Sequence, residues 1–288
     1  MTLEPIEPVP LHPGQRATSR RLALWFGAVF LVTWGIAGLY FVVPDIGERV
    51  GSPGGEDAYH NWLYYLAVYA PTLCGIGFLL AEGGWRALAG TLVGMLSPRR
   101  PLAWAGWLLV AAFALPAGWW LFSLIGQALG VDWMGRTVPA TVFITVPVTL
   151  TTTLYLLPDP GPVGEEFGWR GYAMPRLLDL MAPVPAGMLL GAIWAIWHIP
   201  AFLISASSQA QLPFLIFFLS LTAQGVFICW LYIRTGGNWF LAGFVPHAMI
   251  NCSANLGGFQ SEYWHYALSP ILLAALVCLD PAMRRRAG

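Results

Sequence analysis

Six side chains in the second half of the chain have the types and spacings that hydrolytic chemistry needs. They are Glu165, Glu166 and Arg170 in GEEFGWRGYAMPRL, His198 in WAIWHIPAF, and His247 and Asn251 in PHAMIN. A glutamate assisted by a histidine can activate a water molecule as a general base. A histidine and an amide on one helix face can both donate hydrogen bonds to a developing oxyanion.

The Glu-Glu segment is expected to begin a helix. Prolines and glycines interrupt the chain before it, and a helix is plausible from Glu165 to about Leu180. On such a helix Glu166 and Arg170 are four residues apart and can pair. Glu165 is rotated by about 100° from this pair and remains available. A solvated loop with a simple i,i+4 salt bridge is the structural alternative.

The histidines also have structural alternatives. His247 and Asn251 are four residues apart on one helix face, where they could equally form the interhelical hydrogen bonds that are common in membrane bundles. His198 could be a buried structural histidine. The combination of three such groups with an available carboxylate favours a functional site, because ionisable groups inside a membrane are costly.

Other hydrolase motifs known from membrane proteins are missing. The sequence has no HExxH zinc helix, no aspartate inside an apolar span and no GxSG serine. A metalloprotease of the HExxH type, an aspartyl pair and a rhomboid-type serine protease are therefore excluded. A glutamate base with histidine assistance remains.

The composition indicates that membrane helices position these residues. Of the 288 residues 57% are hydrophobic and 10% are charged, against about 25% charged in an ordinary soluble domain. The net charge is zero, which argues against a nucleic-acid partner. The four cysteines lie far apart in apolar stretches without a CxxC pair, so neither a disulfide framework nor a cysteine zinc site is expected.

Eight windows without Asp, Glu or Arg have about the length of a bilayer-spanning helix. These windows are 22–43, 61–81, 101–126, 137–157, 180–205, 212–233, 235–261 and 263–279. We therefore expect an all-α polytopic membrane helix bundle of about eight transmembrane helices over residues 22–280. A flexible cytoplasmic tail (1–21) would precede it, and a basic cytoplasmic tail (281–288) would follow.

The arginines predict the orientation of this bundle. With eight spans, twelve of the 14 arginines fall on one side, and only Arg49 and Arg136 fall on the other. The positive-inside rule places the twelve, and both termini, in the cytoplasm. The expected location is the cell membrane. The absence of lysine among many Ala, Gly and Pro residues indicates a GC-rich, bacterial source.

The three motifs together resemble the CPBP family of intramembrane proteases, which is related to type II CAAX prenyl endopeptidases and bacteriocin-immunity proteins. That family shows EExxxR, then FxxxH, then HxxxN or HxxxD. The corresponding segments here are Glu165–Arg170, Trp194–His198 and His247–Asn251. The resemblance covers about 155–255. Trp194 departs from the pattern, because the family usually has Phe at this position. An aromatic ring is kept, so we expect Trp194 to have a packing role four residues before His198.

The resemblance implies an intramembrane endopeptidase that hydrolyses a peptide bond of a membrane-associated protein or peptide. Glu165 and His198 would activate the hydrolytic water, and His247 and Asn251 would bind the oxyanion. The implied partners are this substrate and the lipid bilayer, with no nucleic acid. Two rival functions are a non-catalytic member of the family, such as an immunity or accessory factor, and a small transporter. A transporter would predict a pseudo-repeat between halves, which the sequence does not show.

The resemblance further implies that Glu166 and Arg170 orient the site. Glu165, His198 and His247 could form a three-ligand zinc set with an open position, or they could hold a metal-free water. Our interpretation favours a site with no tightly bound metal.

The predicted topology can be tested by cysteine labelling in a background without native cysteines. Single cysteines at Pro10 and Ala287 should react only from the cytoplasmic side, and a cysteine within 50–57 only from the outside, because of the arginine distribution. Labelling of either terminus from outside would contradict the eight-span arrangement.

Overall fold

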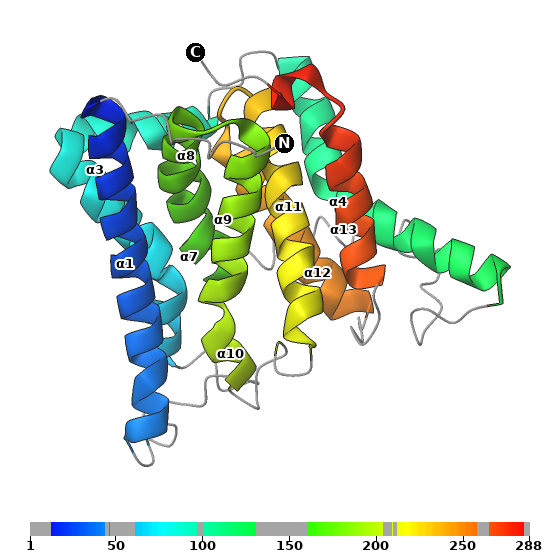
Figure 1. Ribbon diagram of the computed structural model, residues 1–288, viewed down its shortest axis with the longest axis horizontal. Coiled ribbons are helices and arrows are strands. Elements are labelled where there is room, and N and C mark those ends of the chain that lie inside the picture. Colours follow the sequence, from blue (N-terminus) through cyan, green and yellow to red (C-terminus); the bar gives the residue numbers. More distant parts are fainter. Residues whose placement is uncertain are drawn as a thin grey trace, which may run out of the picture.

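The protein is an all-α polytopic membrane bundle (Figure 1). The computed structural model describes residues 13–43, 46, 61–96, 101–130, 160–203, 209, 212–257 and 265–284, and within these ranges no residue forms a strand. Five helices of this described part are long and apolar enough to cross a membrane, and two shorter apolar helices accompany them. The chain is thus a multi-pass membrane protein.

The long helices come from both halves of the chain. They are α1 (Pro13–Val42), α3 (Trp62–Leu96), α4 (Pro101–Ala128), α9 (Pro183–Trp197) with its short continuation α10 (Ile199–Leu203), and α11 (Phe214–Arg234). Shorter elements lie between and after them: α7 (Pro160–Glu166), η2 (Phe167–Ala173), α8 (Met174–Leu180), η4 (Phe240–Phe244), α12 (Val245–Gly257), α13 (His265–Val277) and η5 (Pro281–Met283). Of these, η2 and η4 are π-helices and η5 is a 3₁₀ helix.

Seven of the eight predicted windows coincide with helices, and the window 137–157 lies outside the described residues. The windows 235–261 and 263–279 contain α12 and α13, which are shorter than a full span. Helix α1 begins at Pro13, so residues 13–21, which we expected in the flexible tail, are helical. Proline is favourable in the first turn of a helix, and the arginines that follow it are good helix formers.

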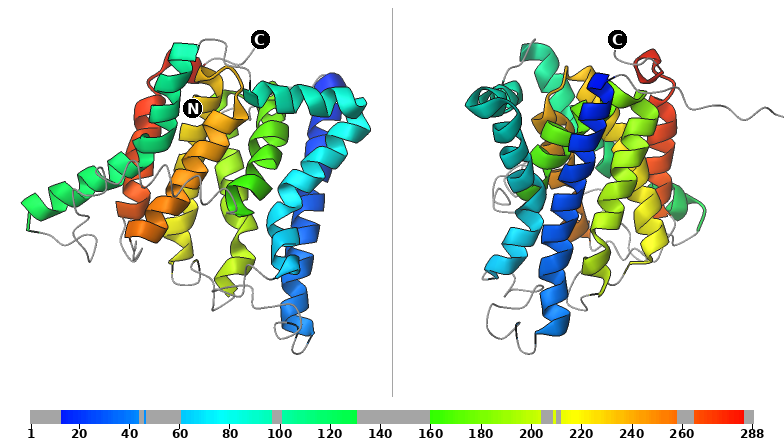
Figure 2. Two further views of the ribbon diagram at one scale, coloured as in Figure 1. Left: turned by 180° about the vertical axis from the view of Figure 1, so that it is seen from behind. Right: turned by 60° about the vertical axis from the view of Figure 1, so that its left-hand side comes forward.

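Helix α3 is longer than its predicted window of 61–81 and continues to Leu96. It bends at Gly84, whose backbone adopts φ 61° and ψ −158°, a conformation that glycine reaches without steric penalty. After this bend the helix runs across one end of the bundle (Figure 2). Residues around Arg86, which the sequence placed in a loop, are therefore helical.

A charged cluster joins α3 to the segment that carries the glutamates. Glu82 accepts a hydrogen bond of 2.6 Å from the Tyr172 hydroxyl and forms an ion pair of 2.6 Å with Arg176. The Arg176 guanidinium also lies 3.6 Å from the centre of the Tyr172 ring. These contacts attach η2 and α8 to α3 beside its bend.

Glycines allow the helices around the site to pack backbone against backbone. A Cβ atom on Gly191 of α9 would overlap the Leu221 carbonyl of α11, and a Cβ on Gly225 of α11 would overlap the Gly187 carbonyl of α9. A Cβ on Gly168 of η2 would likewise overlap the backbone of Pro71 in α3. Such small-residue contacts are a common basis of helix association in membranes. They set the positions of α9 and η2, which carry Trp194 and Arg170.

Candidate active site

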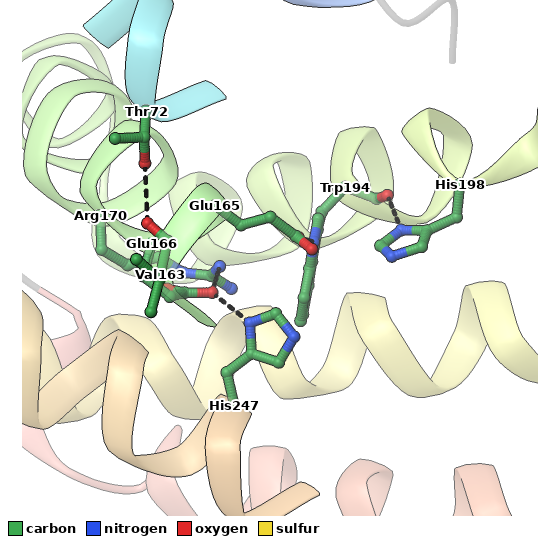
Figure 3. Close-up of polar contacts among 8 residues, drawn as sticks. All are labelled: Thr72, Val163, Glu165, Glu166, Arg170, Trp194, His198 and His247. Atoms are coloured by element: carbon green, nitrogen blue, oxygen red, sulfur yellow. Dashed lines mark hydrogen bonds and ion pairs between the residues drawn. The ribbon is translucent and has the colours of Figure 1, made fainter. Parts of the chain in front are cut away.

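The predicted glutamates and histidines gather between α7, α9 and α12 (Figure 3). Glu165 and Glu166 end α7, His198 follows the last residue of α9, and His247 lies near the start of α12. Glu165, Glu166 and His247 are buried, and His198 is half-buried. Segments separated by more than 80 residues thus contribute to one polar cluster inside the helix bundle.

Glu166 is fully buried and accepts two hydrogen bonds on a single oxygen. Its Oε1 lies 2.6 Å from Nη1 of Arg170 and 2.8 Å from Nδ1 of His247. Arg170 is also fully buried. The i,i+4 ion pair predicted from the spacing is present, but it lies in the protein interior, so the alternative of a solvated loop is wrong.

Two π-helices form the backbone around this ion pair. Arg170 lies within η2, where the Met174 amide donates to the Trp169 carbonyl, and η4 directly precedes α12, where the Val245 amide donates to Phe240. Such i→i+5 turns are rare and occur often at functional sites. We expected a regular helix from Glu165 onward and found instead that α-helical geometry ends at Glu166.

Gly243 of η4 makes room for the buried carboxylate. A Cβ at this position would overlap Oε2 of Glu166 and would lie 3.2 Å from Cγ of Arg170. At Gly243, therefore, only the backbone of η4 lies against the ion pair. Any side chain at this position would displace Glu166.

Trp194 contacts four of the other groups of the site. Its indole Nε1 donates a hydrogen bond of 2.6 Å to Oε2 of Glu165, and its carbonyl accepts one of 2.8 Å from Nδ1 of His198. Its ring lies 4.5 Å from the Arg170 guanidinium and 5.1 Å from the His247 ring, measured to the ring centres. We expected only a packing role here. The available signal was that a buried indole N–H generally has a hydrogen-bond acceptor.

The hydrogen bonds of the two histidines determine which ring nitrogen carries a proton. A carbonyl can only accept, so Nδ1 of His198 must be protonated, and in the neutral ring Nε2 then carries the lone pair. Nδ1 of His247 faces the Glu166 carboxylate and is also the donor. Each ring therefore directs Nε2 away from its Nδ1 partner. This arrangement is typical both of acid–base histidines and of metal-binding histidines.

Glu165 and His198, which we expected to act together on the water, contact each other only through Trp194. No hydrogen bond joins Glu165 to His198, and the Trp194 side chain lies between them in Figure 3. Asn251 lies one turn after His247 on α12 and is half-buried.

The possible zinc ligands Glu165, His198 and His247 each have a protein hydrogen-bond partner: the Trp194 indole, the Trp194 carbonyl and Glu166, respectively. Within the described ranges, no three His, Cys, Asp or Glu side chains lie close enough together to form a metal site.

The segment that carries the three motifs is similar to known proteins. Residues 147–253 match the family model of type II CAAX prenyl endopeptidase Rce1-like proteins, and this range contains all three motifs. The chain is 33% identical over 98 residues to CAAX prenyl protease 2 of Methanococcus maripaludis. The aligned segment covers 32% of this chain and 36% of that protein. The chain thus spans about a third of the length of this curated relative. The resemblance of the chain to the CPBP family of intramembrane proteases is thereby confirmed, on the segment that matches the Rce1-like model.

Proposed function

We propose that this protein is an intramembrane endopeptidase that hydrolyses a peptide bond of a membrane-associated protein or peptide. One observation carries the proposal: the two adjacent glutamates have different environments. Glu166 is paired with Arg170 and His247, whereas Glu165 has one hydrogen bond, to Oε2, and its Oε1 has no partner among the described residues. A buried carboxylate with one oxygen available is what a general base for water requires.

In the proposed reaction, Glu165 takes a proton from a water molecule whose oxygen attacks the scissile carbonyl carbon. His198 assists by accepting a hydrogen bond from this water at Nε2. The tetrahedral intermediate then collapses, the carbon–nitrogen bond breaks, and the proton held by Glu165 passes to the leaving amine. Because the same carboxyl group accepts and returns the proton, Glu165 is regenerated at the end of each turnover.

His247 and Asn251 would stabilise the oxyanion of the intermediate. In this role the His247 ring would carry a proton on both nitrogens, with Nδ1–H donating to Glu166 and Nε2–H donating to the oxyanion. Arg170 balances the charge of Glu166, so that the pair orients His247 without adding net charge.

The first prediction separates the two glutamates. Glu165→Gln should lower turnover by about 10²–10⁴-fold, because it removes the general base, while folding and substrate binding persist. Glu166→Gln should lower both activity and thermal stability, because it leaves Arg170 buried without its anionic partner. Turnover can be followed on a precursor that accumulates in membranes of cells carrying Glu165→Ala.

Cleavage by Glu165→Gln at a rate close to that of the wild type would contradict the assignment of the base. The non-catalytic alternative would replace the protease under two conditions together. No precursor accumulates in membranes of cells carrying Glu165→Ala, and the purified wild type cleaves none of the membrane peptides offered to it.

The second prediction concerns Asn251 and the metal. Asn251→Ala should lower kcat by about 10²–10³-fold with little effect on substrate affinity, because an oxyanion donor acts mainly in the transition state. We expect no stoichiometric metal in the wild type. Turnover and metal content should be measured on the same purified wild type, Asn251→Ala, His198→Ala and His247→Ala.

Stoichiometric zinc in the wild type that is lost in both histidine variants and retained in Asn251→Ala would contradict the metal-free site, because asparagine is a poor zinc ligand. Unchanged turnover of Asn251→Ala would contradict the oxyanion role of this residue and favour the alternative role in interhelical hydrogen bonding.

A further inference from the structure

Trp194 lies at the centre of the site although no step of the proposed reaction uses it. It belongs to the last turn of α9 and is 3% exposed. We propose that Trp194 is a positioning residue, whose indole N–H holds the Glu165 carboxylate in the orientation from which Oε1 can take a proton from water. This inference rests on the proposed role of Glu165 as the base.

The first argument is the freedom that the carboxylate would otherwise have. The terminal torsion of a glutamate has a broad energy minimum, so burial alone does not define which oxygen faces the water. The hydrogen bond of 2.6 Å from Nε1 of Trp194 fixes Oε2 of Glu165 as the acceptor of the indole N–H, so that Oε1 is the oxygen that would face the water. Hydrogen bonds to a charged acceptor are short and strong. Among the described residues Glu165 has no second hydrogen bond that could replace this one.

The second argument is that the indole ring is itself held firmly. The Arg170 guanidinium lies 4.5 Å from the ring centre, and Arg170 is anchored by its ion pair of 2.6 Å with Glu166. The edge-to-face contact with His247, at 5.1 Å between ring centres and 71° between planes, adds a further constraint. The ion pair thereby helps to hold the ring whose N–H donates to Glu165.

The third argument is chemical. An indole N–H can donate but cannot accept. It can therefore donate to Oε2 both before and after Glu165 takes the proton from water, and it cannot remove that proton. Phenylalanine would keep an aromatic ring at this position but would have no donor. The backbone of the same residue also fixes the tautomer of His198. The Trp194 carbonyl accepts a hydrogen bond from Nδ1–H, so the lone pair of the neutral ring is on Nε2.

The experiment compares the wild type with two variants that lack the donor. Trp194→Phe removes the N–H together with part of the ring. Replacement of Trp194 by β-(3-benzothienyl)alanine, introduced at the same codon, exchanges the N–H for sulfur and preserves the size of the ring. Both should lower kcat by about tenfold or more and change KM by less than about twofold, because the carboxylate is misdirected while the substrate pocket persists.

Two matched controls lose an indole hydrogen bond elsewhere. Trp119→Phe removes the bond to the Tyr266 carbonyl between α4 and α13, and Trp230→Phe removes the bond of 2.9 Å from α11 to the Asp280 carboxylate. If the effect at Trp194 came only from lost packing, the benzothienyl variant would behave as the wild type. The controls should change kcat by less than the Trp194 variants.

A second readout tests whether Trp194 acts through Glu165. In a Glu165→Gln background, Trp194→Phe should cause no further loss of residual turnover, because the carboxylate that it positions is already absent. An independent, multiplicative loss would overturn the inference, and so would a benzothienyl variant with the kcat of the wild type. In either case an inactive Glu165→Gln would leave the proposed function intact, whereas an active Glu165→Gln would remove the function itself.

Discussion

The carboxylate of Glu166, buried with Arg170 and His247 on one of its oxygens, is the interaction on which the geometry of the site depends. Moving an ion from water into a protein interior carries a penalty of several kcal/mol, which only an excellent partner geometry offsets. Here the partners come from two different parts of the chain, Arg170 from η2 and His247 from α12. The contact of Glu166 with both partners can form only when α12 packs against α7 and η2, so it couples the fold of the bundle to the arrangement of the polar groups.

The consequences of this contact extend through the neighbouring side chains. Arg170, held by Glu166, lies over the Trp194 ring, and Trp194 in turn holds Glu165 by its indole N–H and His198 by its carbonyl. The glycine contacts of α9 with α11, and of η2 with α3, bring these segments close enough for such short links. At Gly243 the absence of a side chain is equally necessary, because the Glu166 carboxylate occupies that space.

Local features of the site could be predicted from the sequence, and long-range ones could not. The Glu166–Arg170 pair follows from a spacing of four, and the apolar windows correspond to helices because a bilayer demands long apolar runs. The hydrogen bond from His247 to Glu166 joins residues 81 positions apart in the sequence. The periodicity of a helix predicts contacts between residues three or four positions apart, and it does not predict contacts between separate helices. The π-helices escaped prediction because their i→i+5 turns leave no known residue signature. Trp194 was interpreted as packing because an aromatic four residues before a histidine also fits an ordinary helix face.

A double-mutant cycle on Glu166 and Arg170 tests most directly whether this buried pair organises the protein. Glu166→Gln, Arg170→Met and the double variant would be compared with the wild type by thermal unfolding in one detergent or nanodisc composition. Glu166→Gln leaves Arg170 buried without its carboxylate, and Arg170→Met leaves the buried Glu166 with His247 as its one remaining partner. Removing one partner of a buried pair is expected to destabilise the protein by about 3–5 kcal/mol. We predict that the double variant unfolds at a temperature no lower than the less stable single variant, because it contains no unpaired charge. Destabilisation of the double variant by the sum of the two single effects would contradict the central role of the pair.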